Sequence, residues 1–442
     1  MVHLQIQQLY MQSYVKMEPP VNHVPNSASR PLGDPAPARA SHALWLVLLA
    51  AAGTFALTMG VRQTMGLYLS SVNTSTGLGI ANISLAFAFG QLWWGLTQPF
   101  AGAVADRIGT ARVLLLGVVL IAIGTVITPL MTSTWGLILA IGVLAAGGAG
   151  MAGPSVLMAA STRMVPAAQR GLATGIVNAG GSFGQFALAP VAMGLTASLG
   201  WMASMQWLGV LVLLALPAAW VLKGNSRAMA AAAASASGVA VLTARQALAR
   251  AFATPSYGLL AAGFMVCGFH IAFLATHLPG VIESCGLPPA IAGWSLALIG
   301  LFNIVGSLGM GWAVGRWRMK SLLSLLYATR GLAVLAFVLA PKTPAVVLVF
   351  AAVMGVTFLS TVPPTAGLVA KMFGPANMAM LFGVLMLAHQ IGGFFGAFLG
   401  GHVFQVTGSY DWVWYVDIAL AAGAALVHLP IREARPAPLA AA

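Results

Sequence analysis

Gly102-Ala-Val-Ala-Asp106-Arg107-Ile-Gly109-Thr-Ala-Arg112 joins two apolar runs, and a degenerate copy, Gly311-Trp-Ala-Val-Gly315-Arg316-Trp-Arg318-Met-Lys320, follows 209 positions later. The same offset superposes residues well outside the loop: Pro154 on Pro363, Pro166 on Pro375 and Gly184 on Gly393. Prolines and an arginine that match at one offset indicate a chain built of two duplicated halves.

The composition excludes a water-soluble protein. Hydrophobic residues make up 60% of the 442 positions and charged residues only 6%, against about 25% charged residues in soluble domains. A bilayer crossing needs about 20 apolar residues, and runs of that kind lie at 43–69, 81–104, 112–131, 136–161, 171–198, 202–222, 256–280, 289–313, 321–340, 344–369, 378–405 and 412–430. We therefore predict an all-α membrane protein with twelve transmembrane helices in two six-helix bundles.

The net charge of +13 does not indicate a nucleic-acid partner. Lysine and arginine gather mostly in short loops between the apolar runs, and this asymmetry is the positive-inside signature. It predicts a multi-pass protein of the cell inner membrane with both termini in the cytoplasm.

The polar and charged segments divide the chain further. We predict a disordered cytoplasmic tail over 1–42, a first bundle over 43–222, a cytoplasmic linker over 223–255, a second bundle over 256–430 and a C-terminal tail over 431–442. No charged segment with a cleavage site precedes the first apolar run, so no signal peptide is expected.

The loop over 102–112 has Gly, Asp-Arg, Gly and a basic residue at the spacing of one known signature. It closely resembles the signature loop of the major facilitator superfamily, although the second copy lacks the Asp and the second Gly. The resemblance covers about 43–430 and implies two bundles that alternate access to a central cavity.

Evidence for a subgroup comes from the first apolar run. Three segments resemble bacterial relatives of the monocarboxylate transporters and oxalate/formate antiporters. They are Gly60-Val-Arg62-Gln63-Thr-Met-Gly66-Leu-Tyr68 in this run, 268–279 and 389–393. The eighth run departs from well-studied monocarboxylate carriers, because it offers Asn303 where they have Asp and Arg. The Gly-Pro-x-x-Gly-Gly element of drug/proton antiporters is missing from 178–185, which disfavours multidrug efflux without eliminating it.

Arg62 is the strongest candidate for a substrate ligand, because an ionised side chain at bilayer depth needs a partner. The resemblance implies that the first and seventh helices line the cavity, and the 209-residue offset places Arg62 at the depth of His270. A guanidinium can bind a carboxylate with a planar fork, and an imidazole adds a proton-dependent donor. Arg62 could alternatively bond helix carbonyls or extend toward the membrane surface.

Other polar side chains in the runs could complete this pocket, or could simply bond two helices together. These substrate-binding candidates are Gln63, Asn178, Asn303, His389 and Gln390. His270 and His389 are also candidates for proton coupling, since the pKa of histidine lies near physiological pH, and Asp417 is a third.

Two further sets of charged residues are expected to act outside the pocket. Arg330 and Asp417 fall in the ninth and twelfth runs, and we predict that they form a structural ion pair. The loop residues are expected to form a conformational latch, or alternatively a local cap: Gly102, Asp106, Arg107, Gly109, Arg112 and Arg316.

Taken together, the sequence predicts a secondary active transporter that moves a small organic anion, in the first instance a monocarboxylate, with a proton or by exchange. The alternatives are an exporter of drugs or amphipathic metabolites and a transporter-like sensor. No nucleophile motif or metal-ligand spacing is present, so we expect no enzyme, cofactor or metal. We expect no disulfide between Cys267 and Cys285, and a protein that functions as a monomer in the lipid bilayer.

Overall fold

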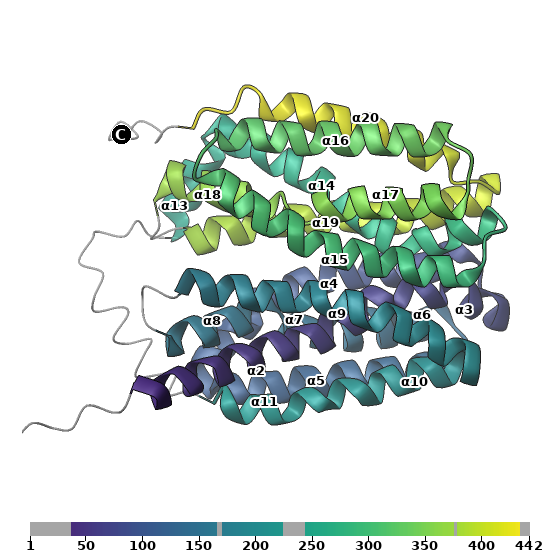
Figure 1. Ribbon diagram of the computed structural model, residues 1–442, viewed down its shortest axis with the longest axis horizontal. Helices are drawn as coiled ribbons and strands as arrows, with labels where there is room; N and C mark the ends of the chain where they lie inside the picture. Colours follow the sequence, from purple (N-terminus) through teal and green to yellow (C-terminus); the bar gives the residue numbers. More distant parts are fainter. Residues whose placement is uncertain (1–36, 166–169, 224–243, 375–377, 434–442) are drawn as a thin grey trace, which may run out of the picture. The chain divides into compact units, whose positions relative to one another are not determined.

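The computed structural model describes residues 37–165, 170–223, 244–374 and 378–433, and residues from Ala43 onward form one compact unit. In this unit the helices of each half of the chain group together (Figure 1). The predicted tails over 1–36 and 434–442, and most of the predicted linker, lie outside the described residues.

The first half consists of helices separated by short turns. Its elements are α2 (Pro37–Thr64), η1 (Met65–Tyr68), α3 (Leu69–Thr76), α4 (Ile80–Ile108), α5 (Thr110–Ile127), η2 (Thr128–Leu130), α6 (Thr134–Leu137), η3 (Ile138–Ala145), α7 (Ala146–Met151), α8 (Pro154–Met164), α9 (Arg170–Leu199), α10 (Trp201–Leu211), η5 (Val212–Ala215) and α11 (Leu216–Val221). Gly109 separates α4 from α5 with a φ of 100°. Side chains other than glycine rarely adopt that backbone conformation, which explains the second glycine of the loop.

The second half repeats this plan after a short amphipathic helix. Its elements are α13 (Ala244–Phe252), α14 (Pro255–Ser284), α15 (Pro289–Val314), α16 (Met319–Leu339), α17 (Pro344–Thr357), α18 (Val362–Phe373), α19 (Met378–Thr407) and α20 (Asp411–His428). Proline opens α14, α15 and α17 as a first helical residue, where its missing N–H costs nothing.

Ten helical segments in the described residues are long and apolar enough to cross a membrane. The helices α4 and α20 occupy the second and twelfth predicted positions and do not meet that criterion. Gln91, Gln98 and Pro99 lie within the continuous helix α4 and lower its mean hydropathy, and two aspartates lie in the short α20. Large apolar side chains such as Trp135 and Leu339 are more than three-quarters exposed, as expected of a surface that faces lipid.

Corresponding spans of the two halves break at the repeated prolines. In the fourth span, η3 is π-helical, α7 ends at Met151, and α8 begins at Pro154. In the tenth span, α17 ends at Thr357 and a second helix, α18, follows, with Pro363 as its second residue. The shared break supports the duplication that the sequence indicates.

Candidate functional site

Arg62, near the end of α2, lies among neutral partners. Its Nη2 donates to Oε1 of Gln91 on α4, its Nη1 donates to Oε1 of Gln63 at 3.4 Å, and its guanidinium carbon lies 4.6 Å from the ring centre of Trp94. The acidic side chains that the structure describes, those of Glu283, Asp411, Asp417 and Glu433, are all absent from its surroundings. Within the described part of the chain, the guanidinium is therefore a cation without a counterion.

A cavity of about 40 Å³ adjoins this guanidinium. Helices α2, α4 and α5 and the fourth span supply most of its wall, and Ala275 and Thr276 of α14 close it from the other bundle. A cavity of this size can hold a few water molecules.

The bundles are closed at one end only. We call the end that carries the loops 102–112 and 311–320 the basic end, and the opposite end the far end. At the far end, Ala81 N donates to Gln405 Oε1 at 2.8 Å, and a Cβ built on Gly293 would lie 3.2 Å from the Cβ of Met193.

The same pairs of helices are apart at the basic end. No atom lies within 4 Å of a Cβ built on Gly102 of α4 or Gly383 of α19, and the same holds for Gly175 of α9 and Gly311 of α15. The interface between the bundles is therefore sealed at the far end and open at the basic end.

His270 does not share this cavity with Arg62. Its Nε2 lies 3.2 Å from Oδ1 of Asp417 inside the second bundle, both side chains are about 1% exposed, and His270 is not among the residues of the cavity wall. The repeat places the two residues at similar depth, but α14 presents Ala275 and Thr276 to Arg62. The structure thus separates the predicted clamp into two sites.

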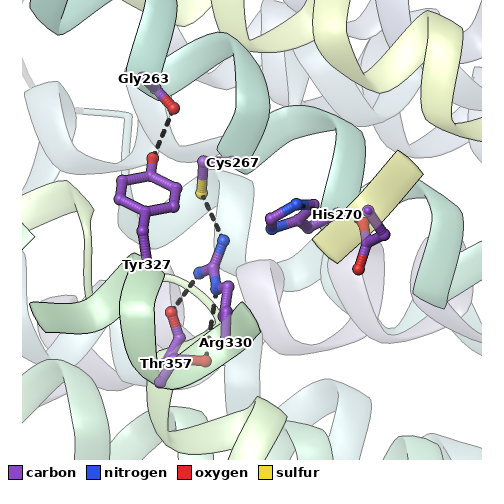
Figure 2. Close-up of polar contacts among 7 residues, drawn as sticks. Gly263, Cys267, His270, Tyr327, Arg330 and Thr357 are labelled. Atoms are coloured by element: carbon purple, nitrogen blue, oxygen red, sulfur yellow. Dashed lines mark hydrogen bonds and ion pairs between the residues drawn. The ribbon is translucent and has the colours of Figure 1, made fainter. Parts of the chain in front are cut away.

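The structure also changes the partner of Arg330. The prediction paired it with Asp417, but neither carboxylate oxygen of Asp417 accepts a hydrogen bond in the described structure. Arg330 donates to the carbonyl oxygen of Thr357 and reaches Cys267 Sγ at 3.5 Å (Figure 2). It also donates to the carbonyl oxygen of Phe358 at 2.7 Å.

These contacts define a structural role for Arg330. Thr357 is the last residue of α17, and the helix break leaves its terminal carbonyls without intrahelical donors. A cation at a helix C-terminus also meets the negative end of the helix dipole. Tyr327, one turn before Arg330, donates to Gly263 O at 2.6 Å and ties α16 to α14 (Figure 2).

The other predicted pocket residues lie at helix contacts. Asn303 donates to Ser182 Oγ of the first bundle at 2.8 Å and accepts from Leu359 N at 2.9 Å. His389 and Gln390 are buried on α19, where His389 Nδ1 and Gln390 Nε2 are 3.2 Å apart. Asn178 is partly buried on α9. Of the uncharged candidates, Gln63 lines the cavity, whereas Asn178, Asn303, His389 and Gln390 do not.

The predicted latch residues lie at the basic end. Arg107 and Arg112 are exposed, and the side chain of Asp106 is outside the described part of the chain. In the second copy, Arg316 lies over Trp312 at 4.0 Å and donates to the Trp312 carbonyl at 3.3 Å. A Cβ built on Gly102 or Gly109 would have no described atom within 4 Å.

Three residues that contact the predicted ligands were missed in the sequence analysis: Gln91 and Trp94 contact Arg62, and Ser182 contacts Asn303. Gln91 and Trp94 are three apart on α4, a spacing that puts both on one helix face toward Arg62. A glutamine in an apolar run is a signal that could have identified Gln91. Ser182 carries no such signal, because a serine in a transmembrane run is common. Among the described residues, no group of three or more His, Cys, Asp or Glu could hold a metal ion.

Comparison with known proteins identifies the class. The sequence model of the Major Facilitator Superfamily matches residues 43–358 and 260–442. The chain belongs to the Major Facilitator Superfamily. It is a multi-pass membrane protein and a secondary transporter, not an enzyme, which confirms the predicted family and fold.

Distant relatives agree with this assignment. The chain is 24% identical over 397 residues to monocarboxylate transporter 13 of Rattus norvegicus, a match that covers 87% of this chain and 89% of the relative. It is 22% identical over 409 residues to the MFS-type transporter YcxA of Bacillus subtilis (strain 168), covering 87% and 94%.

Solved structures share the fold. A crystal structure of a D-xylose-proton symporter matches with a TM-score of 0.70 and 14% identity, covering 88% of this chain and 97% of that one. The inward open conformation of the xylose transporter XylE from E. coli matches with a TM-score of 0.67 and 13% identity, covering 88% and 96%.

Proposed function

We propose that this transporter moves a small organic anion, a monocarboxylate, and that Arg62 binds its carboxylate. The observation that carries the proposal is a guanidinium beside a cavity at the bundle interface, with amides and an indole ring as its partners and no acidic side chain among the described residues of the cavity wall. A cation held away from water is costly until an anion neutralises it. An anionic substrate would supply that charge.

The geometry around Arg62 supports recognition of a carboxylate. The amide oxygens of Gln63 and Gln91 each take one N–H group, and Trp94 packs against the guanidinium. A guanidinium has five N–H donors, so donors remain for a two-pronged bond to a carboxylate. Among the described residues of the cavity wall, Arg62 is the one with a cationic side chain, which favours a substrate with one carboxylate over a dicarboxylate. The similarity to monocarboxylate transporter 13 supports the same class.

Proton coupling is the second part of the proposal. The His270–Asp417 pair is buried in the second bundle and can hold one proton between an imidazole nitrogen and a carboxylate oxygen 3.2 Å apart. Arg330 and Tyr327 are the other titratable groups next to the pair. His389 stays a candidate because it lies on α19, which packs against α14. Exchange of two anions without a proton is the alternative mode.

We also propose an orientation and a location. The cluster of basic loops at one end favours a cytoplasmic basic end, with both termini in the cytoplasm and the protein in the cell inner membrane. In that orientation the described conformation opens to the cytoplasm. The domain boundaries predicted from the sequence, the loop 102–112 as a latch, and function as a monomer belong to this proposal.

Transport in liposomes tests the substrate class. Purified protein is reconstituted into liposomes that contain a pH-sensitive dye, and lactate, pyruvate, formate, oxalate and benzoate are added in turn. Protein-free liposomes correct for passive entry of the neutral acids. Protein-dependent acidification by a monocarboxylate is the expected result. Silence with all of the acids, both here and in counterflow with preloaded liposomes, would refute the anion proposal and favour the drug exporter.

Arg62→Lys tests the role of the guanidinium. A lysine keeps the charge but cannot form the fork. Loss of one charge-assisted hydrogen bond of about 1.5–3 kcal/mol raises the half-saturating substrate concentration by a factor of roughly 10 to 150. Arg245→Lys makes the same chemical change at an exposed position on α13 and should transport like the wild type. Equal kinetics for Arg62→Lys and wild type would show that Arg62 is structural.

Asp417→Asn separates proton coupling from transport. The amide cannot take up the proton, so we expect acidification of the lumen to stop while counterflow of labelled substrate continues. Proton uptake that is unchanged in Asp417→Asn would exclude the His270–Asp417 pair as the coupling site. Loss of both activities in a monodisperse protein would also contradict a role limited to coupling.

A further inference from the structure

A second cavity lies at the basic end of the second bundle, far along the chain from Arg62. It measures about 370 Å³, within the range of about 300–1,000 Å³ that is usual for small-ligand sites. The start of α16, the end of α18 and the segment after α20 form its wall. We call it the α16–α18 basic pocket, defined by Arg318, Lys320, Lys371, Pro430, Ile431, Arg432 and Glu433.

The pocket already binds one oxyanion of the chain itself. Glu433 Oε2 lies 3.0 Å from Lys371 Nζ, and Glu433 Oε1 accepts from the backbone N–H of Lys320 at 2.8 Å. Lys320 is the second residue of α16, whose free N–H groups favour anions. Lys320 Nζ in turn donates to Leu429 O at 2.7 Å. The lysines are therefore engaged within the protein.

The two arginines of the pocket are not engaged in this way. Arg318 and Arg432 are both exposed, and neither guanidinium has an ion pair with a carboxylate in the described part of the chain. The wall carries four cationic side chains and one carboxylate, so it keeps a net positive charge. A phosphate group matches the two free guanidinium groups, because its oxygens can accept paired N–H donors.

The surroundings place the pocket at the level of lipid headgroups. Trp312 and Trp317 are both more than half exposed, their rings pack edge to face at 5.3 Å, and Trp317 precedes Arg318 in the chain. Exposed tryptophans concentrate at the membrane–water boundary. Basic pockets at the cytoplasmic side of transmembrane helices are suited to acidic lipid headgroups.

We propose that the α16–α18 basic pocket binds the phosphate of an anionic phospholipid, with Arg318 and Arg432 as its ligands. The lipid's acyl chains would lie along the apolar surface of the second bundle, and its headgroup would enter the pocket beside the Lys371–Glu433 ion pair. The site is separate from the cavity at Arg62, so the proposal does not depend on the transported substrate.

Lipid binding to the full-length protein tests the site. Detergent-purified protein is titrated with phosphatidylglycerol or with phosphatidylcholine of the same acyl chains, and bound lipid is counted by native mass spectrometry. We expect phosphatidylglycerol to bind in preference. Near a membrane surface each basic residue contributes about 1 kcal/mol, or roughly fivefold in affinity, so Arg318→Gln with Arg432→Gln should weaken binding by about 25-fold.

Two further variants control for charge and folding. Arg245→Gln removes an exposed basic residue of α13, outside the pocket, and should leave the tightest lipid site unchanged. Arg318→Lys with Arg432→Lys keeps the charge and should retain most of the affinity. Equal binding by the glutamine double variant and the wild type, or an equal loss in Arg245→Gln, would overturn the proposal.

A last comparison separates lipid from free phosphate. Inorganic phosphate at 20 mM should displace little of the bound phosphatidylglycerol, because it lacks the acyl chains that add apolar contact. Thermal stabilisation by inorganic phosphate alone, lost in the glutamine double variant and not matched by phosphatidylglycerol, would overturn the lipid assignment and identify a site for soluble phosphate.

Discussion

Gly66→Ala should shift the transporter away from the conformation described above. Gly66 lies in η1, where the first bundle meets α14 of the second. A Cβ at this position would overlap the carbonyl oxygen of Ala275 and would lie 3.0 Å from that of Thr276. Both obstacles are backbone atoms, so no side-chain rotation can relieve the overlap, and the two bundles must separate at the far end.

The size of the effect follows from the cost of overpacking. Inserting a methyl group into a close contact costs about 1–3 kcal/mol when the surroundings must shift, which corresponds to a roughly 5- to 150-fold change in the ratio of closed to open far ends. Gly53→Ala is the matched control. It is the same substitution on the preceding helix α2, and no atom lies within 4 Å of its added Cβ.

Disulfide trapping measures this ratio. The pair Met193→Cys and Gly293→Cys reports on a closed far end, since the two Cβ positions are 3.2 Å apart, a few tenths of an ångström closer than the roughly 3.5–4.5 Å of a disulfide. Cys285→Ser removes the less buried of the two native free cysteines from the background. We expect Gly66→Ala to slow oxidative cross-linking at least fivefold and Gly53→Ala to leave it unchanged. Equal cross-linking rates in a monodisperse Gly66→Ala protein would refute the reasoning.

Two predictions concern stability of the second bundle. Gly268→Ala should lower the free energy of unfolding by about 1–3 kcal/mol, because its Cβ would overlap the carbonyl oxygen of His389 on α19. The control is Gly258→Ala on the same helix α14. Its Cβ meets no atom within 4 Å, so this variant should melt like the wild type. Arg330→Leu should lower the free energy of unfolding by about 2–4 kcal/mol, since it leaves two buried carbonyls at the end of α17 without donors. An unchanged melting temperature would show that other donors replace the guanidinium.

The sequence was sufficient for the fold because its signals are local. Runs of apolar residues define the spans, basic loops separate them, and the repeated prolines at Pro154 and Pro363 fall where the fourth and tenth spans break. The spans at α4 and α20 were found from the sequence although both contain polar residues. For the site, sequence reasoning identified Arg62 and its neighbour Gln63, because a charge in an apolar run is conspicuous.

The pairing of polar residues on different helices needed the tertiary structure. The sequence placed Asp417 with Arg330 and Arg62 with His270, whereas the structure joins Asp417 to His270 and Arg62 to Gln91. Each helix residue turns the side chain by about 100°, and a helix that is apolar on nearly every side carries no pattern that sets its rotation about its own axis. Packing against neighbouring helices sets that rotation. It thereby decides which charges meet and which end of the bundles is closed.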